Sequence, residues 1–385
     1  MGCSHHDVNA VSMCCRAESA ESDDNIFRSR VMIKDILGRP QLQLPDIAEP
    51  DFIAGKTVLM SGGAGSVGAE LAKKVFRSGA RKIIILDHDQ DGLGRAKSAL
   101  DQETPTAIFE CVLADVRDHG LLSEVFSNTR PHIIFHLAAT KHVAVAEQFP
   151  IEAYSTNLRG TKNIAALAEA FGGERFVHFS TDKAASPTTI MGHSKLCAEF
   201  DLASRLSSAR RGGGMKISAV RYCNVFGSSG SVIPKFREQI SRRAPLSLTD
   251  TRVARRFMSM DEAVDLAFYA ASPSVSHGAD TLSLYSLDVG LPIPILSLLH
   301  RLVEMSGLRM GKDIDLNITG LPAYEKVVED EFSEDEWCHI RRDGPLLISR
   351  PDCLAALNFD GAQLDAIIES RDHGALLDVC GRIAI

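Results

Sequence analysis

Short apolar runs alternate with stretches of helical character from residue 57 to residue 222, and this alternation limits the fold more than any other feature of the chain. A strand that is apolar on both faces must be covered on both faces, and helices between consecutive strands provide that cover in a parallel sheet. We therefore predict an α/β fold with a doubly wound parallel sheet. The predicted strands are Thr57–Met60, Lys82–Leu86, Ala107–Leu113, Ile133–His136, Arg175–Ser180 and Ile217–Tyr222.

The glycine-rich turn after the first predicted strand has the spacing of a dinucleotide-binding loop. Gly62, Gly65 and Gly68 follow the strand and open a helix, so backbone N–H groups can approach a pyrophosphate at the helix N-terminus. Ser66 and Val67 lie in the same turn. Strand, turn and helix together predict a Rossmann-type nucleotide-binding fold.

Acidic residues end the next two predicted strands. Asp87 ends the second, where a carboxylate accepts a hydrogen bond from a ribose 2′-OH and repels a 2′-phosphate, so NAD is favoured over NADP. Asp115 and Val116 follow the third strand and are placed for the adenine edge.

The regular alternation ends after residue 223, and this change divides the chain into predicted segments. Residues 1–48 are predicted as an N-terminal tail with a short helix at 26–38, and residues 49–223 as the NAD-binding Rossmann domain. Residues 224–343 are predicted as mainly a smaller substrate-binding lobe at the carboxyl ends of the strands, where α/β sheets bind ligands. Residues 344–385 form a C-terminal extension.

Composition excludes several classes of protein. The net charge of -8 over 385 residues provides no basic surface for nucleic acid. Since no apolar run reaches about 18 residues, we expect no membrane span, and residues 1–24 lack the apolar core of a signal peptide, which predicts a cytoplasmic protein. The nine cysteines include no Cys-x-x-Cys pair, so we expect reduced thiols, with Cys223 in the core, and no metal site.

An acid and an amine stand side by side after the fifth predicted strand. Eight residues after Asp182-Lys183 comes Met191, followed by Lys195. A short-chain dehydrogenase normally carries Tyr-x-x-x-Lys at this place, and the thioether of Met191 cannot exchange a proton. Proton transfer would therefore fall to Asp182 and Lys183, and an adjacent acid and amine are what a dehydration needs.

Several further motifs, spread over residues 38–329, resemble those of one family. Together they are similar to the nucleotide-sugar 4,6-dehydratases of polysaccharide biosynthesis, a branch of the extended short-chain dehydrogenase/reductases in which some members carry Met in place of Tyr. The motifs are Gly38-Arg39-Pro40, the glycine-rich loop, Leu86-Asp87-His88, Ala138-Ala139-Thr140-Lys141-His142-Val143, Asn157-Leu158-Arg159-Gly160-Thr161, Ser180-Thr181-Asp182-Lys183-Ala184, Met191-Gly192-His193-Ser194-Lys195, Arg221-Tyr222-Cys223-Asn224-Val225, Gly230-Ser231-Val232-Ile233-Pro234 and Arg255-Arg256-Phe257-Met258.

The resemblance implies a reaction and its catalytic residues. Bound NAD would take hydride from sugar C4 and return it at C6, with water lost between these steps. Lys183 would be the base at C5, Asp182 the acid at the C6 oxygen, and Lys195 the group that orients the nicotinamide ribose. We expect burial and the positive charges of Lys195 and the cofactor to favour neutral Lys183. Thr181 or Ser180 would bond the C4 oxygen.

Other positions are binding or packing candidates by the same resemblance. Met191 would pack beside the nicotinamide, and Ala138 is a cofactor-binding candidate. For the substrate, Asn224 and Arg255 are candidates to bind the diphosphate, because Arg matches phosphate geometry. Lys141 and His142 follow the fourth strand and could either reach the sugar or diphosphate or have surface roles, whereas Asn157 is expected to tie strands and loops together.

The chain departs from the family pattern at three places, where Gly227-Ser228-Ser229-Gly230 lacks an Arg, and Gly290-Leu291-Pro292 and Pro322-Ala323-Tyr324-Glu325-Lys326 replace family runs. Arg252 or Arg256 are the candidates to compensate. We expect 4,6-dehydration of a nucleotide-activated N-acetylhexosamine, chiefly UDP-N-acetylglucosamine, with C5 inversion left open. The alternatives are an epimerase or net oxidoreductase on the same fold, or a catalytically silent NAD-binding regulator. The resemblance also implies that helices such as 151–171 and 191–208 pair between subunits, so we expect a homo-oligomer whose number of subunits the sequence does not fix.

Overall fold

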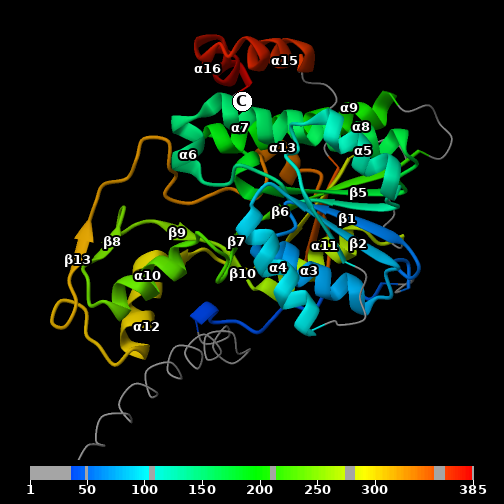
Figure 1. Ribbon diagram of the computed structural model, residues 1–385. Helices are drawn as coiled ribbons and strands as arrows, with labels where there is room; N and C mark the ends of the chain where they lie inside the picture. Colours follow the sequence, from blue (N-terminus) through cyan, green and yellow to red (C-terminus); the bar gives the residue numbers. More distant parts are fainter. Residues whose placement is uncertain are drawn as a thin grey trace, which may run out of the picture. The chain divides into compact units, whose positions relative to one another are not determined.

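A computed structural model of the chain describes residues 36–47, 51–103, 109–208, 214–273, 282–350 and 360–383. The chain divides into two compact units, Met1–Leu42 and Gln43–Ile385. In the first unit, Ile36 and Leu37 are helical, and the rest of the helix predicted at 26–38 lies outside the described residues or beyond the helix end. The second unit contains the sheet and every candidate site residue (Figure 1).

Six consecutive parallel strands of a nine-stranded sheet, with β3 at one edge, confirm the predicted doubly wound fold. Their spatial order, β3-β2-β1-β4-β5-β6, is the Rossmann order. Each predicted strand is present with its bounds shifted by at most one residue, except that residues 107 and 108 of the third prediction lie outside the described residues. The strands are β1 (Thr57–Ser61), β2 (Lys82–Asp87), β3 (Phe109–Leu113), β4 (Ile133–His136), β5 (Arg175–Thr181) and β6 (Lys216–Tyr222).

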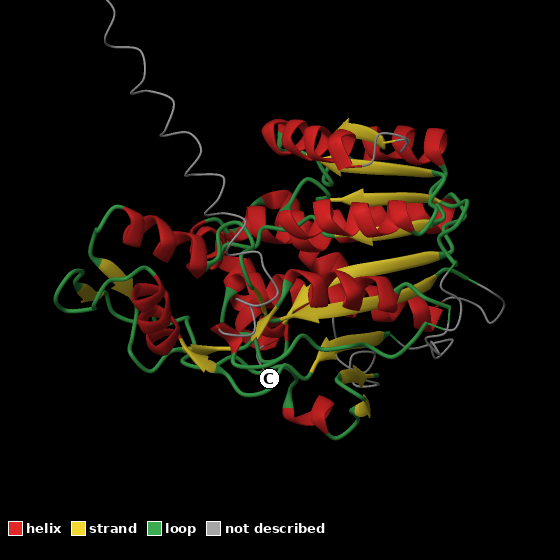
Figure 2. Cartoon of the chain, turned by 90° about the horizontal axis from the view of Figure 1, so that it is seen from below, coloured by secondary structure: helices red, strands yellow, loops and turns green. Residues whose placement is uncertain are grey.

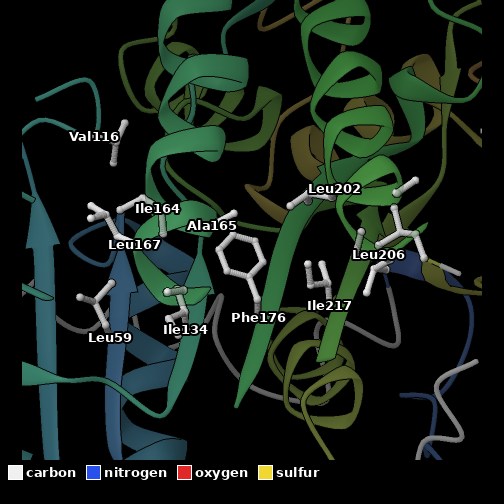
Figure 3. Packing of buried hydrophobic residues seen from close by; sticks show 14 of the residues in the cluster. Leu59, Val116, Ile134, Ile164, Ala165, Leu167, Phe176, Leu202, Leu206 and Ile217 are labelled. Carbon is white, nitrogen blue, oxygen red and sulfur yellow. The ribbon is translucent and has the colours of Figure 1, made fainter. Parts of the chain in front are cut away.

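Helices cover both faces of this sheet (Figures 1 and 2). One face carries α3 (Ser66–Arg77), α4 (Gln90–Glu103) and α11 (Met260–Ala270), and the other carries α5 (His119–Thr129), α8 (Gly160–Ala170) and α9 (Ile190–Ser208). Leu59, Ile134, Phe176 and Ile217 from four adjacent strands belong to one apolar core cluster with residues of α8 and α9 (Figure 3). Burial on both faces explains why the strands read as continuous apolar runs.

Three strands from the C-terminal part of the chain extend the same sheet. β11 (Ser283–Leu287) pairs parallel to β6, and β15 (Leu346–Ser349) pairs antiparallel to β11. β14 (Arg341–Asp343) forms the edge. β11 lies within residues 224–343, which were predicted as mainly a smaller lobe, and the structure shows that it continues the central sheet.

A smaller lobe lies where the parallel strands end, as predicted (Figure 1). It is connected through β7 (Asn224–Val225), which follows β6 directly and pairs with β10 (Phe257–Met258). Its other elements are β8 (Leu246–Leu248), β9 (Ala254–Arg255), β12 (Ile293–Pro294), β13 (Leu316–Ile318), α10 (Val232–Ser241) and α12 (Ile295–Met305).

Short helical segments connect β4 to α8, and others follow β5 and lie near the C-terminus. These segments are α6 (Val143–Gln148), α7 (Pro150–Tyr154), the π-helical turn η1 (Ser155–Arg159), the 3-10 turn η2 (Asp182–Ala184), α13 (Glu334–Trp337), α15 (Gly361–Ser370) and α16 (His373–Ile383). Among the described residues, none of the helices combines the length and apolar character needed to cross a membrane.

A buried guanidinium ties four of these elements together. Arg221 of β6 is 1% exposed and contacts Glu199 of α9 at 2.6 Å and Glu336 of α13 at 2.7 Å. Ser180 at the end of β5 donates a 2.5 Å hydrogen bond to Glu199. Removing one partner of such a pair leaves an uncompensated buried charge, so this network holds the strand ends and α9 in a fixed relation.

We expect Arg221→Met to reduce the free energy of unfolding by about 3–5 kcal/mol, because Glu199 and Glu336 lose their buried partner. Arg309→Met is the matched control, since Arg309 pairs with Asp313 at the surface and should change the free energy by less than about 1 kcal/mol. Urea denaturation measures both. Equal midpoints for the two variants would show that the buried pair is not a stabilising clamp.

Candidate active site

The glycine-rich loop passes so close to its neighbours that side chains are excluded at two of its positions. Gly62 has φ +70°, and a Cβ there would lie 2.4 Å from the backbone N of Ala138. A Cβ on Gly68 would lie 2.5 Å from the carbonyl oxygen of Gly63. The glycines thus allow the tight turn and the close contact of α3 with the loop, and they place Ala138 beside it.

The start of α3 suits an anion. Its cap residue, Gly65, supplies no side-chain cap, and no acidic side chain lies in the first turn, which begins with Ser66 and Val67. Asp87, buried at the end of β2, accepts hydrogen bonds at 3.1 Å from the backbone N–H groups of Ala64 and Asp89. These residues therefore fit the pyrophosphate and the ribose of a dinucleotide.

The two residues predicted for the adenine edge have partners within the protein. Asp115 accepts hydrogen bonds from the side chain of Arg117, and the shortest of them, from Nη2 to Oδ2, measures 2.6 Å. These bonds lower the pKa of Asp115. Val116 is buried against α8, where a Cβ on Gly160 would approach its side chain to 2.6 Å. Their role toward adenine stays a prediction.

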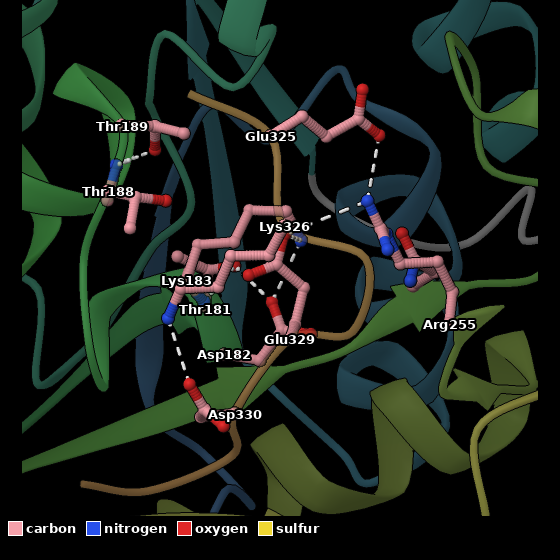
Figure 4. Close-up of polar contacts among 12 residues, drawn as sticks. Thr181, Asp182, Lys183, Thr188, Thr189, Arg255, Glu325, Lys326, Glu329 and Asp330 are labelled. Atoms are coloured by element: carbon pink, nitrogen blue, oxygen red, sulfur yellow. Dashed lines mark hydrogen bonds and ion pairs between the residues drawn. The ribbon is translucent and has the colours of Figure 1, made fainter. Parts of the chain in front are cut away.

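Asp182 and Lys183 lie in the short turn that follows β5. Lys183 Nζ donates a 3.0 Å hydrogen bond to Asp182 Oδ1, and the same oxygen accepts a 3.0 Å bond from Thr181 Oγ1 (Figure 4). Asp182 is 4% exposed. An acid and an amine are thus hydrogen-bonded to each other, largely shielded from solvent, at the carboxyl end of a parallel strand.

The expectation that Lys183 is driven toward its neutral form was wrong for the free protein. Burial does lower the pKa of Lys183, but attraction from Asp182 and Glu329 outweighs burial, and the pKa is raised overall. The nearby cation that opposes this rise is Arg255, not Lys195. Lys183 and Asp182 therefore rest as an ion pair.

Glu329 is a site residue that the sequence analysis missed. Its carboxylate lies 3.9 Å from Lys183 Nζ and 3.9 Å from Arg255 Nη2, so it stands between the two cations (Figure 4). Burial raises the pKa of Glu329. The available signal was the acidic run from Glu325 to Glu331, which begins inside one of the departures from the family pattern.

Contacts within the protein hold Arg255 beside this cluster. It is 7% exposed, donates to the carbonyl oxygens of Ala254 and Val327 at 2.9 Å, and pairs with Glu325 at 2.8 Å. These bonds direct its guanidinium toward the segment that carries Glu329. The structure thus brings Arg255 to Lys183.

The two residues in the short-chain dehydrogenase positions are both buried on α9. Lys195 Nζ donates a 2.7 Å hydrogen bond to the carbonyl oxygen of Phe179, and burial lowers the pKa of Lys195 to about 7 although Glu199 opposes this shift. Met191 is 5% exposed and belongs to an apolar cluster, as a packing residue should. Between them, a Cβ on Gly192 would lie 2.3 Å from the carbonyl oxygen of Lys183, so glycine is required for α9 to reach the turn.

Lys141 and His142 contact the loop at Ser229 and Gly230, and Ser229 in turn contacts Ser66 at the start of α3. Lys141 Nζ donates a 2.6 Å hydrogen bond to the carbonyl oxygen of Ser229, and Ser66 Oγ lies 3.1 Å from Ser229 Oγ. His142 packs against Gly230, where a Cβ would meet the ring at 2.3 Å. Burial lowers the pKa of both Lys141 and His142. Ser229, which stands where the family carries Arg, therefore holds Lys141 near the helix start.

Asn157 and Asn224 both bind backbone. Asn157 accepts a 2.7 Å bond from the N–H of Thr140 and donates to Ser194 Oγ at 2.8 Å, which confirms its predicted role between loops. Asn224 donates to the carbonyl oxygen of Arg256 at 3.1 Å, and its predicted contact with substrate remains a prediction. Cys223 is buried, as expected.

The two arginines proposed as compensating cations also have protein partners. Arg252 pairs at the surface with Asp250 at 2.8 Å. Arg256 donates to the carbonyl oxygen of Glu329 at 2.8 Å and lies 3.5 Å from the carboxylate of Glu331. Within the described residues, no group of His, Cys, Asp and Glu has the arrangement of a metal site.

Comparison with known proteins places these features in a family. The family model described as "Polysaccharide biosynthesis protein" matches residues 58–345. The probable polysaccharide biosynthesis protein EpsC of Bacillus subtilis is 33% identical over 307 residues, which cover 80% of this chain and 50% of EpsC. The chain thus spans about half the length of that relative.

A second relative and a solved structure match over most of their own length. The UDP-N-acetylglucosamine 4,6-dehydratase (inverting) of Campylobacter jejuni serotype O:23/36 is 31% identical over 295 residues, covering 73% of this chain and 79% of that enzyme. The X-ray structure of Pen from Bacillus thuringiensis superposes with a TM-score of 0.69 at 26% identity, covering 78% of this chain and 88% of Pen.

The lowered pKa of Lys195 predicts a pH dependence of stability. Between about pH 7 and pH 10.5 the unfolded chain holds a proton on Lys195 that the folded chain lacks, so stability should rise with pH by roughly 1 kcal/mol per unit. Below pH 7 both states are protonated and the contribution is constant. Lys195→Met should remove this slope, whereas Lys97→Met at the surface should keep it. Urea denaturation across this range gives the slopes, and parallel curves for Lys195→Met and the unaltered protein would refute the prediction.

Proposed function

The chain belongs to the family of polysaccharide biosynthesis proteins, and on this premise we propose that it is an NAD-dependent 4,6-dehydratase of a nucleotide-activated sugar. A relative that matches 73% of the chain carries that activity in its name. The contact that carries the proposal is the hydrogen bond between Asp182 and Lys183 at the end of β5. It joins the two groups that water elimination requires.

One proton transfer along this bond prepares both groups for catalysis. The ion pair holds its proton on Lys183, and transfer of that proton across the 3.0 Å contact between Nζ and Oδ1 makes Lys183 a free amine and Asp182 a carboxylic acid. The amine can then take the C5 proton, and the acid can give its proton to the departing C6 hydroxyl. Binding a sugar excludes water, which disfavours separated charges and therefore promotes this transfer.

The residues around the pair have complementary roles. When bound, NAD supplies the reversible oxidation of the sugar, taking hydride from C4 and returning it at C6. Gly62, Gly65 and Asp87 would hold it, and Lys195 would bond its ribose. Thr181, already bonded to Asp182, would bond the C4 oxygen.

The proposed substrate is UDP-N-acetylglucosamine, and the proposed product is its 4-keto-6-deoxy derivative. Lys141 supports binding of the diphosphate, because Ser229 holds its ammonium beside the loop that receives the cofactor. Arg255 lies instead at the acid–base cluster, so we assign it to the sugar end through Glu329. This assignment replaces the sequence-based expectation that Arg255 binds the diphosphate.

An epimerase on the same fold would need a proton-transfer group at position 191 and would leave Asp182 and Lys183 idle. Met191 is a buried thioether that carries no exchangeable proton. The ion pair is retained in full. Both observations favour dehydration over epimerisation or net oxidation, and a silent regulator would have no need for the pair.

The deciding experiment is incubation of the protein with UDP-N-acetylglucosamine and NAD in deuterated water, followed by mass spectrometry. We expect a product lighter by one water that carries solvent deuterium at C5. Lys183→Ala should reduce the rate by at least 100-fold with NAD binding intact, as expected for loss of a general base. An unchanged mass with this and other nucleotide sugars would reject the dehydratase assignment. A product of unchanged mass but altered C4 configuration would establish an epimerase.

Glu329→Gln should shift the pH dependence of this activity. The proposed reaction uses the one proton that the pair holds, so activity should fall at the pH where Lys183 loses it to solvent. The carboxylate of Glu329 helps to raise the pKa of Lys183, so its removal should move this falling, alkaline limb of the kcat/KM profile to lower pH. Glu325→Gln is the control, because Glu325 pairs with Arg255 instead. Superimposable profiles for all three proteins would exclude an influence of Glu329 on the base.

A further inference from the structure

The C-terminal helices cover a face of the molecule that the sequence analysis assigned to a second subunit. Helices α15 and α16 form a hairpin at residues 360–383, and α16 packs on α7 and α9 (Figure 1). Helix α7 lies at the start of the range 151–171 and α9 matches the range 191–208 to within one residue, and these ranges were expected to pair between subunits. The chain therefore supplies from its own C-terminus a cover for the surface where a homodimer was predicted.

The contact is an apolar core of its own. From the body of the protein, Ile151, Tyr154 and Cys197 are at most 1% exposed in it, and from the hairpin Leu364 and Leu376 are equally buried. Removing the apolar area of these side chains from water provides the main driving force for packing the hairpin on the body. Without the hairpin, the same side chains would form an exposed apolar patch, which marks an interaction surface.

Polar contacts around this core fix one docked position. Lys162 of α8 contacts Asp365 at 2.7 Å and the carbonyl oxygen of Gly361 at 3.0 Å. Arg371, which follows α15, pairs with Glu152 of α7 at 2.6 Å. Specific partners at both ends of α15 indicate a defined interface rather than loose coverage.

A hydrogen bond inside the core adds to this definition. Tyr154 Oη lies 2.9 Å from Cys380 Sγ of the hairpin, and the thiol of Cys197 on α9 is a second partner for this hydroxyl. Docking therefore adds a hydrogen bond between the hairpin and a buried hydroxyl of the body.

We propose that the hairpin at residues 360–383 closes the α7–α9 face to a second subunit, so that the chain does not form a homodimer through this face. The occupant of the face is thus a segment of the chain itself. The proposal concerns assembly and does not depend on the catalytic assignment. It replaces the expectation that helices 151–171 and 191–208 pair between subunits.

Two adjacent leucines of α16 provide a matched test in the full chain. Leu376 is fully buried in the interface, whereas Leu377 is 53% exposed. Leu376→Asp should release the hairpin and expose the apolar face, so light scattering should show a concentration-dependent rise in mass of twofold or more. Leu377→Asp should keep the mass of the unaltered protein. A Leu376→Asp protein that releases the hairpin without a change in mass, or that falls to a smaller mass, would overturn the proposal.

Hydrogen exchange on the same samples shows whether the variant has released the hairpin or unfolded. In Leu376→Asp, residues 361–383 should lose at least tenfold protection while β1 keeps its own. Loss of protection in β1 would mean that the variant has unfolded globally. The proposal would then be decided by cross-linking of the unaltered protein.

Carbodiimide cross-linking of the unaltered protein tests whether the hairpin docks on its own chain. The Lys162–Asp365 ion pair can be converted to an amide in a mixture of 14N- and 15N-labelled chains. We expect linked peptides of a single isotope. Peptides of mixed isotope would show that the hairpin docks on a second copy, and this result would overturn the proposal.

Discussion

The buried guanidinium of Arg221 is the constraint on which the rest of the site depends. It fixes Glu199 of α9, and Glu199 in turn accepts a hydrogen bond from the hydroxyl of Ser180, two residues before Asp182. Lys195 lies one helical turn before Glu199 on the same helix, and the Glu199 charge opposes the loss of a proton from Lys195. A single ion network thus positions the end of β5 and tunes the lysine beside it.

A second connection crosses from the C-terminal part of the chain. Lys326 donates to the carbonyl oxygen of Ser186 at 2.5 Å and pairs with Asp330 at 2.8 Å, and Thr188 donates to the carbonyl oxygen of Tyr324 at 3.0 Å. These bonds fasten the segment carrying Glu329 to the loop after the turn that holds Asp182 and Lys183 (Figure 4). The charge next to Lys183 therefore depends on contacts made about 140 residues away in sequence.

The sequence predicted the parts of the structure that have a local signal. Apolar strands, the glycine-rich turn and the acid at the end of β2 each follow from a short pattern, and the structure contains all three. The antiparallel addition of β15 to β11 had no such signal, because strand pairing is decided by tertiary contact. The raised pKa of Lys183 was missed for the same reason, since Glu329 reaches it from a distant segment.

The hairpin shows a different limit of sequence reasoning. Leu364, Ile367 and Ile368 on α15 have helical spacing, as do Leu376 and Val379 on α16, so an amphipathic pair could have been recognised. The pattern shows that a helix face is apolar but does not show which surface packs against it. The apolar faces of α7 and α9 would have the same sequence pattern whether a partner subunit or the chain's own C-terminal hairpin covered them.

The distribution of charge across the site has a consequence for how a nucleotide sugar would lie in it. At the acid–base cluster, the cations Lys183 and Arg255 are balanced by Asp182, Glu325 and Glu329, so this end offers no excess positive charge to a diphosphate. It suits an uncharged sugar ring, whose hydroxyl groups can exchange hydrogen bonds with carboxylates and ammonium groups. The anionic part of the ligand must then face the other group of residues, around Lys141 and the start of α3, where the helix dipole and an ammonium both favour negative charge.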